Sequence, residues 1–183
     1  PETERLSFSA QTVGFMFLPI SLLFVGAVLV LNGLWMSGRI SDREIVVINF
    51  ATAAIPAPVA AVSLVRATTG DEVRSVALTL LFSATYLWVA VNRLNGADGR
   101  GLGWFSLFVS LSVLPQAFLA LASAAKFIDI WLGICSLTWS GLWFMYFATL
   151  TLKKPVQDQT AVATLLSGVL TAWLPALFLM YGA

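Results

Sequence analysis

The sequence predicts an all-α integral membrane protein, with six transmembrane helices that form three repeated hairpins around a pore in each protomer. Its composition lies outside the range of soluble domains, because hydrophobic residues make up 59% of its 183 residues, charged residues make up 10%, and the mean hydropathy is +0.90. Six apolar segments are long enough to cross a hydrocarbon core about 30 Å thick, which takes roughly 20 helical residues. Proline also recurs at nearly equal intervals, deep in every second segment.

The first two apolar segments are separated by a charged loop. The first covers about residues 15–35 and follows residues 1–14, a polar segment to which no function is assigned. The loop holds four charged residues between positions 39 and 44, and the second segment then covers about residues 45–66. Both segments match the length of a membrane-spanning helix.

The remaining four apolar segments alternate with short loops in the same way. The third and fourth cover about residues 74–93 and 103–124, and the fifth and sixth cover about residues 127–152 and 160–182. Because nearly all of the charge lies in the loops, we expect residues 15–183 to form one six-helix transmembrane domain.

The spacing of the prolines predicts a triplicated unit. Pro56, Pro115 and Pro175 are separated by 59 and 60 residues, and similar positions in the odd-numbered segments recur 60 residues apart. Each unit holds two spans, so the three hairpins cross the membrane in the same direction and are related by an axis along the membrane normal. Three hairpins around such an axis would enclose a central pathway. The positions 60 residues apart are Phe24, Ala84 and Phe144, and Asn32, Asn92 and Leu152.

The balance of Lys and Arg between the loops predicts the orientation. The side that holds the hairpin tips carries six such residues and the other side carries four, which favours cytoplasmic tips and both termini outside. The six are Arg39, Arg43, Arg93, Arg100, Lys153 and Lys154, and the four are Arg5, Arg66, Arg74 and Lys126.

The charge and residue content of the chain disfavour several classes of function. A net charge of +1 gives no electrostatic basis for binding nucleic acid, and the single cysteine, Cys135, allows neither a disulfide framework nor a cysteine metal site. Without histidine, most transition-metal and haem sites are also disfavoured, so no metal or cofactor is expected. Pumps and proton-coupled carriers place ionisable residues at membrane depth, and an intramembrane hydrolase needs a base there. We therefore expect passive movement of a neutral solute and no enzymatic activity.

Tryptophan and proline supply the candidate features of a pathway. Trp139 and Trp143 lie four residues apart and share one helix face, where they could form a packed aromatic core, a lipid-facing ridge or a slot for a thin planar solute. The three prolines leave backbone carbonyls without an N–H donor, which could serve a solute that donates hydrogen bonds or could simply reflect kinked packing.

Five apolar runs resemble helices of the AmiS/UreI family of bacterial urea and short-chain amide channels. The similarity follows the same order along residues 18–182. Residues 22–33 resemble the first helix of the family, 80–92 the third, 104–115 the fourth, 137–143 the fifth and 168–176 the sixth.

This resemblance implies an assembly, a membrane and a set of pore residues. The family pattern is a protomer with its own pore, assembled into a homo-hexamer with membrane lipid filling the centre of the ring, in the bacterial cytoplasmic (inner) membrane with both termini outside. The pore and substrate-binding residues implied are Leu18, Leu22 and Leu29 in the first helix, Ala84 and Trp88 in the third, Trp139, Leu142 and Trp143 in the fifth, and Ser167 in the sixth.

Three departures from the urea-selective, acid-gated members place the chain closer to the amide channels that are not acid-gated. Ser167 stands where urea-selective members carry Glu, Ala84 stands where the acid-gated channel carries an aromatic residue, and the histidine-bearing outer loops are absent. The expected function is a passive channel for small neutral amides such as urea, acetamide and formamide, without gating by histidine. Two alternatives stay open: a non-transporting membrane sensor or assembly protein, and a proton-coupled amide transporter.

Overall fold

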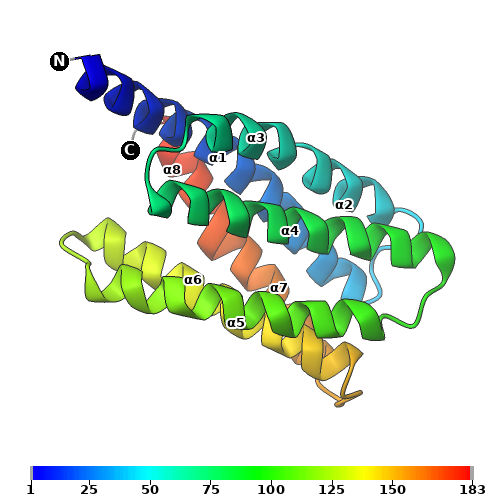
Figure 1. The fold of residues 1–183 in the computed structure, drawn as a ribbon. Helices are drawn as coiled ribbons and strands as arrows, with labels where there is room; N and C mark the ends of the chain where they lie inside the picture. Colours follow the sequence, from blue (N-terminus) through cyan, green and yellow to red (C-terminus); the bar gives the residue numbers. More distant parts are fainter. Residues whose placement is uncertain (1, 182–183) are drawn as a thin grey trace.

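The computed structural model describes the backbone of residues 2–181 and the side chains of residues 19–127 and 129–181. Throughout that range the regular structure is helical (Figure 1). The elements are α1 (Glu2–Met36), α2 (Ile45–Ala54), α3 (Pro56–Arg66), α4 (Gly70–Asn95), α5 (Arg100–Ala122), α6 (Phe127–Leu150), α7 (Gln157–Ser167), the π-helix η1 (Gly168–Trp173) and α8 (Leu174–Tyr181).

Within the part of the chain that the structure describes, six helical stretches are long and apolar enough to cross a membrane, so the protein is a multi-pass membrane protein. The prediction of six helical spans in these regions of the chain is confirmed. The second span consists of α2 and α3, and the sixth consists of α7, η1 and α8. The first span shares α1 with the preceding residues, because this helix runs from Glu2 without a break and projects beyond the other helices (Figure 1).

The spans form one bundle whose closest packing lies between successive hairpins. The second span packs along α4, α5 packs along α6, and the sixth span packs along α1, whereas the two spans of each hairpin touch less. Glycines allow the approach of α1 to η1. A Cβ added at Gly26 would lie 2.8 Å from the backbone nitrogen of Trp173, and one at Gly168 would lie 2.8 Å from that of Val30.

The three prolines do not occupy equivalent places. Pro56 begins α3 after a break at Ile55, Pro115 lies inside the continuous helix α5, and Pro175 is the second residue of α8, which follows the π-helix η1. Proline lacks the N–H that an α-helix needs at its interior, so it can break or rearrange a helix, but neighbouring helices decide the outcome at each site.

The recurring unit of structure has a period of 57 residues in the odd-numbered spans. Positions 57 apart are buried together, and this register replaces the spacing of about 60 predicted from the prolines. Spacings of 57 and 60 differ by three residues, which turn about 300° around an α-helix. Positions 60 apart therefore lie near the same face of the helix but almost one turn further along its axis. The buried sets are Gly26, Ser83 and Ser140; Val28, Thr85 and Leu142; Leu29, Tyr86 and Trp143; and Gly33, Ala90 and Phe147.

The even-numbered spans repeat at 57 and 58 residues. Asn49, Ser106 and Thr164 are fully buried, and each donates a side-chain hydrogen bond to the backbone carbonyl four residues earlier. Asn49 also exchanges two hydrogen bonds with Asn32, at 3.2 and 2.8 Å, which tie the first two spans together.

Candidate functional site

The described side chains enclose a cavity toward each end of the bundle. Cavity 1, about 840 Å³, opens toward the end where α8 finishes and where α4 and α6 begin. Cavity 2, about 390 Å³, opens toward the hairpin tips. Each draws side chains from all three hairpins, and these side chains follow the spacing of 57. Cavity 1 is lined by Ser21, Leu78 and Cys135; Leu22, Thr79 and Ser136; and Val25, Phe82 and Trp139, and cavity 2 by Asn32, Val89 and Tyr146; and Trp35, Asn92 and Thr149.

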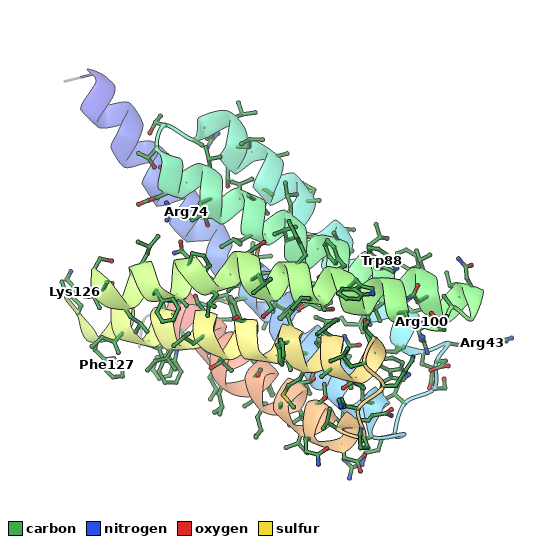
Figure 2. All side chains as sticks on the ribbon, turned by 60° about the horizontal axis from the view of Figure 1, so that its bottom comes forward. Arg43, Arg74, Trp88, Arg100, Lys126 and Phe127 are labelled. Atoms are coloured by element: carbon green, nitrogen blue, oxygen red, sulfur yellow. The ribbon has the colours of Figure 1, made fainter. Side chains whose placement is uncertain are left out.

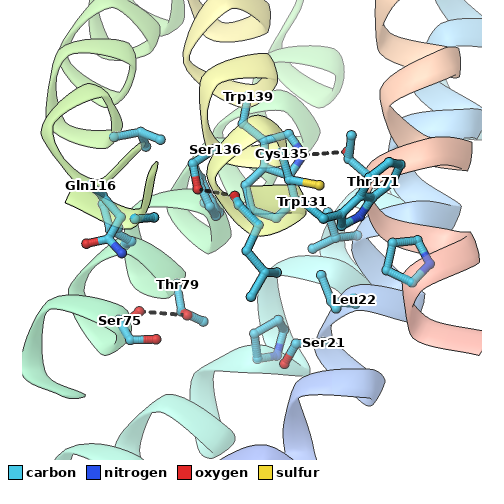
Figure 3. Close-up of a pocket in the computed structure, with 18 of the residues that line it drawn as sticks. Ser21, Leu22, Ser75, Thr79, Gln116, Trp131, Cys135, Ser136, Trp139 and Thr171 are labelled. Atoms are coloured by element: carbon cyan, nitrogen blue, oxygen red, sulfur yellow. Dashed lines mark hydrogen bonds between the residues drawn. The ribbon is translucent and has the colours of Figure 1, made fainter. Parts of the chain in front are cut away.

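An aromatic cluster forms the deep wall of cavity 1. The ring of Phe82 lies edge-on to Trp139, with centroids 5.5 Å apart, and tilted against Trp143 at 4.9 Å. Edge-on and offset contacts are the favourable arrangements for aromatic pairs, so the three rings stabilise one another. Trp139 is half-buried and presents its ring to the cavity, as the close-up of cavity 1 shows (Figure 3).

Two threonines hold the indole groups in place. The Trp139 Nε1–H donates to Thr171 Oγ1 at 2.7 Å, and the Trp143 Nε1–H donates to Thr85 Oγ1 at 3.2 Å (the first bond is drawn in Figure 3). Each threonine hydroxyl in turn donates to the carbonyl four residues earlier in its own span. Because both indole N–H groups are occupied, a solute in cavity 1 meets the faces and edges of these rings.

The two cavities meet at Tyr86 and Trp143, which line both and which we call the junction. Trp143 and Tyr86 are each 2% exposed, and together with Leu29 they belong to a buried core that also holds Leu142 and Val113. Among the described residues the Tyr86 hydroxyl has no hydrogen-bond partner. A buried hydroxyl without a partner is costly, and a polar solute at the junction would supply one.

Charged groups stand only near the mouths of the two cavities, as far as the described residues show. At cavity 1, Arg74 pairs with Asp71 at 2.9 Å and donates to Gln116 at 3.0 Å. At cavity 2, the Arg93 guanidinium lies over the Trp35 ring and within 3.7 Å of Asp42. Figure 2 shows Arg43 and Arg100 at the hairpin-tip end of the bundle and Lys126 at the opposite end.

Asp98, in the loop at the mouth of cavity 2, is held in its charged form. The backbone N–H of Arg100 and then its side chain donate to the carboxylate, at 3.0 and 2.6 Å, and these hydrogen bonds lower the pKa of Asp98. Lys153 donates to the Asp98 carbonyl at 3.3 Å, which connects the second and third hairpin tips.

Most polar side chains in cavity 2 already have a partner. Tyr86 and Asn92 are the exceptions among the described residues, and both come from α4. The partnered side chains are Asn32, Trp35, Asp42, Thr85, Arg93, Asp98, Ser106, Trp143, Tyr146, Thr149 and Gln157.

The structure brings together part of the residue set that the family resemblance implied. Leu22, Trp139 and Trp143 line cavity 1, and Trp143 also lines cavity 2. Leu29 and Leu142 are buried in the core beside the junction but line neither cavity. Leu18 lies outside the residues whose side chains the structure describes.

Three of the implied pore positions lie away from both cavities. Ala84 and Trp88 are exposed on α4 and line neither cavity, and the Trp88 ring instead lies 5.4 Å from that of Phe105. The reason is register, because the face of α4 toward the cavities carries Phe82 and Tyr86. An aromatic side chain therefore does stand in this wall, and the expected widening at Ala84 is absent.

Ser167 is buried and lines neither cavity. It precedes η1, where Gly168 approaches α1, and its carbonyl accepts the hydrogen bond from Thr171. The sequence did not single out Phe82, which lines cavity 1, or Tyr86, which lines both cavities. It also did not reveal that Thr85 and Thr171 accept the N–H groups of the two indoles. The spacing of 57 residues that relates Phe82 to Trp139 was a signal that could have found Phe82.

Comparison with known proteins identifies related chains over nearly the whole length. The family model described as "AmiS/UreI family transporter" matches residues 17–183. The chain is 38% identical to a Mycolicibacterium smegmatis protein named as a transporter of amidate substrates, over 89% of this chain and 76% of that protein. It is 30% identical to the acid-activated urea channel of Helicobacter pylori, over 87% of this chain and 95% of that one.

A solved structure matches the fold as well. The Helicobacter pylori urea channel in its closed state, determined by electron cryomicroscopy, superposes with a TM-score of 0.80 and 32% sequence identity. The match covers 90% of this chain and 97% of that chain.

Proposed function

The chain belongs to the AmiS/UreI family, and from this premise we propose that it is a passive channel for small neutral amides, with urea, acetamide and formamide as permeants. The resemblance expected from the sequence is thereby confirmed at the level of the family, and the protein is a membrane channel or transporter and not an enzyme. The substrate and the passive mechanism are the proposal.

The observation that carries the proposal is the junction. Cavity 1 and cavity 2 approach each other from opposite ends of the bundle and share only Tyr86 and Trp143 among the described lining residues. A thin planar solute fits between aromatic rings, and the unpartnered Tyr86 hydroxyl supplies one hydrogen bond where the two cavities meet. We infer that small shifts of these two side chains connect the cavities during permeation.

The same apolar surroundings support the exclusion of ions. Val113, Leu29 and Leu142 pack around the junction, and no Asp, Glu, Lys or Arg lines the described walls between the two mouths. Moving a charged solute out of water costs far more than moving a neutral amide, so an apolar constriction discriminates between them.

The proposed assembly follows the family and the distribution of charge. We infer a homo-hexamer with lipid at its centre, in a bacterial cytoplasmic membrane with both termini outside. The exposed apolar side chains of the six spans supply surface for lipid and for neighbouring copies, and the cationic excess at the hairpin tips supports the orientation.

Stopped-flow uptake of urea and acetamide into proteoliposomes tests the function. We expect faster uptake than in empty vesicles, a comparable rate for the two solutes, and a loss of flux for both in Trp143→Ala. Trp104→Ala is the matched control, because Trp104 is exposed on α5 and lines neither cavity. Uptake equal to that of empty vesicles would favour a non-transporting protein, and uphill accumulation driven by a pH gradient would favour a proton-coupled transporter.

A further inference from the structure

Asn92 is a buried polar side chain that the packing of the bundle leaves without a partner. It is 5% exposed, it lines cavity 2, and its carboxamide makes no hydrogen bond to any described residue. The Tyr86 hydroxyl is the only fully buried unpartnered side-chain polar atom among the described residues, so the amide atoms of Asn92 are open to cavity 2. A carboxamide offers two donors and an acceptor to a solute there. Arg93, the next residue on α4, does not bind the Asn92 carboxamide, because its guanidinium interacts with Asp42, the Ala97 carbonyl and the ring of Trp35.

The structure contains an example of the partner that fits such a group. Asn32 and Asn49 join their carboxamides through two reciprocal hydrogen bonds, at 3.2 and 2.8 Å. In this arrangement each amide donates an N–H to the oxygen of the other. A primary amide or urea presents a carbonyl oxygen and an N–H on the same edge, so it can replace one member of the pair.

We propose that Asn92 is a second binding position for the permeating amide, on the hairpin-tip side of the junction. The solute's N–H donates to Asn92 Oδ1 and its carbonyl accepts from Asn92 Nδ2. Asn92 lies six residues beyond Tyr86 on α4, which is about 9 Å along the helix axis. A solute leaving the junction therefore meets this carboxamide next. This inference rests on the proposed function for the identity of the solute.

The binding step can be tested without measuring transport. The chain holds four asparagines, Asn32, Asn49, Asn92 and Asn95, so protein labelled with ¹⁵N at asparagine shows four side-chain amide groups by NMR in lipid nanodiscs. Asn92→Leu and Asn95→Leu assign two of them. On titration with acetamide, the Asn92 resonances shift in a saturable way, while those of Asn95, which is exposed and lines neither cavity, stay in place.

The choice of probe separates pairing from crowding. N,N-Dimethylacetamide keeps the carbonyl but has no N–H, so it produces a smaller shift at Asn92 and requires a higher concentration. An Asn92 resonance that does not move with acetamide, or that moves equally with both probes, would overturn the proposal whether or not the protein transports amides.

Transport gives the second measurement. In proteoliposomes, Asn92→Leu lowers acetamide permeability about 3- to 10-fold, the effect of losing one or two hydrogen bonds between neutral groups, whereas Asn95→Leu retains the wild-type value. If the wild type and Asn92→Leu conduct acetamide equally well, Asn92 is refuted as a binding position, and the channel function is unaffected. Wild-type protein that does not conduct refutes the proposed function, and the NMR titration then decides on Asn92 alone.

Discussion

Ser167 illustrates how one position changes meaning between sequence and structure. The family pattern makes it the place to look for urea preference, whereas the bundle buries it where η1 packs on α1, away from both cavities. We expect Ser167→Glu to lower stability by several kcal/mol, since a carboxylate would be buried there without a partner. Thermal unfolding in detergent measures this.

Ser167→Ala serves as the control, and it should unfold near the wild-type temperature. A Ser167→Glu protein that folds normally and prefers urea to acetamide more strongly than wild type would contradict the packing role. It would restore the selectivity that the family pattern implies.

Cys135 is a natural reporter of cavity 1. It is the only cysteine in the sequence, and its buried side chain lines the cavity one turn from Trp139 (Figure 3). Methyl methanethiosulfonate is small enough to enter the cavity, and the thiomethyl group it adds occupies part of the path. We expect treatment to reduce acetamide flux in the wild type and to have no effect in Cys135→Ala. Mass spectrometry confirms the labelling, and full labelling without any change in flux would place the path elsewhere.

The π-helix η1 is the element that positions Trp139. Its wider turn carries Thr171 into the wall of cavity 1, where the hydroxyl accepts the indole N–H at 2.7 Å. Thr171→Val keeps the shape but leaves this N–H unpaired. We expect a loss of about 1–3 kcal/mol in stability, the cost of an unsatisfied buried donor. Unfolding of the purified protein in detergent measures the change.

A double-mutant cycle isolates that contact. In a Trp139→Phe background no indole N–H remains, so Thr171→Val should cost little, and Thr171→Ser should preserve the contact in the wild-type background. Thr138→Val is the control, because the Thr138 hydroxyl lies on the exposed side of α6 and donates only to the Ile134 carbonyl of the same helix. A Thr171→Val effect of equal size with and without Trp139 would show that the hydroxyl acts through helix packing alone.

For the helices, the sequence predicts well where each span lies, but it predicts poorly which residues of a span are equivalent between hairpins. Hydropathy and charged loops locate six helical stretches to within a few residues, because membrane thickness and backbone hydrogen bonding leave few alternatives. Proline spacing sets a period of about 60, while burial follows 57, because a proline is tolerated at several levels of a span. The family resemblance implies Ala84 and Trp88 as pore residues, whereas the side chains of α4 that line the cavities include Phe82 and Tyr86, each two residues earlier.

Side-chain partnerships are the part of the site that no pattern in this sequence reveals. Trp139 and Trp143 stand out by residue type and spacing. The free hydroxyl of Tyr86 and the free carboxamide of Asn92 are distinguished only by what their neighbours on other helices fail to offer. Such an absence depends on the whole bundle, so it becomes visible only in three dimensions.

The response of the whole channel to pH follows from its loops. The sequence has no histidine, and hydrogen bonds lower the pKa values of Asp98, from Arg100, and of Glu44, from Ser41. Carboxylates with lowered pKa values stay charged until the pH falls below their ordinary range, near 4. We therefore expect acetamide flux to change less than about twofold between pH 7.5 and 5.5, the range in which histidine would titrate. A steep rise in flux on acidification would contradict this.

The period of 57 residues has a consequence for how the side chains at one level of the bundle can change by mutation. Leu29, Tyr86 and Trp143 occupy one position in three copies of the hairpin, yet the copies belong to a single chain, so each can mutate alone. In a ring of three separate identical subunits, one codon change would alter all three sides together, and three indoles at this level would crowd the axis. Fusion of the copies lets one level combine an aliphatic side chain, a phenol and an indole. Selectivity can then be adjusted by single substitutions that leave the rest of that level intact.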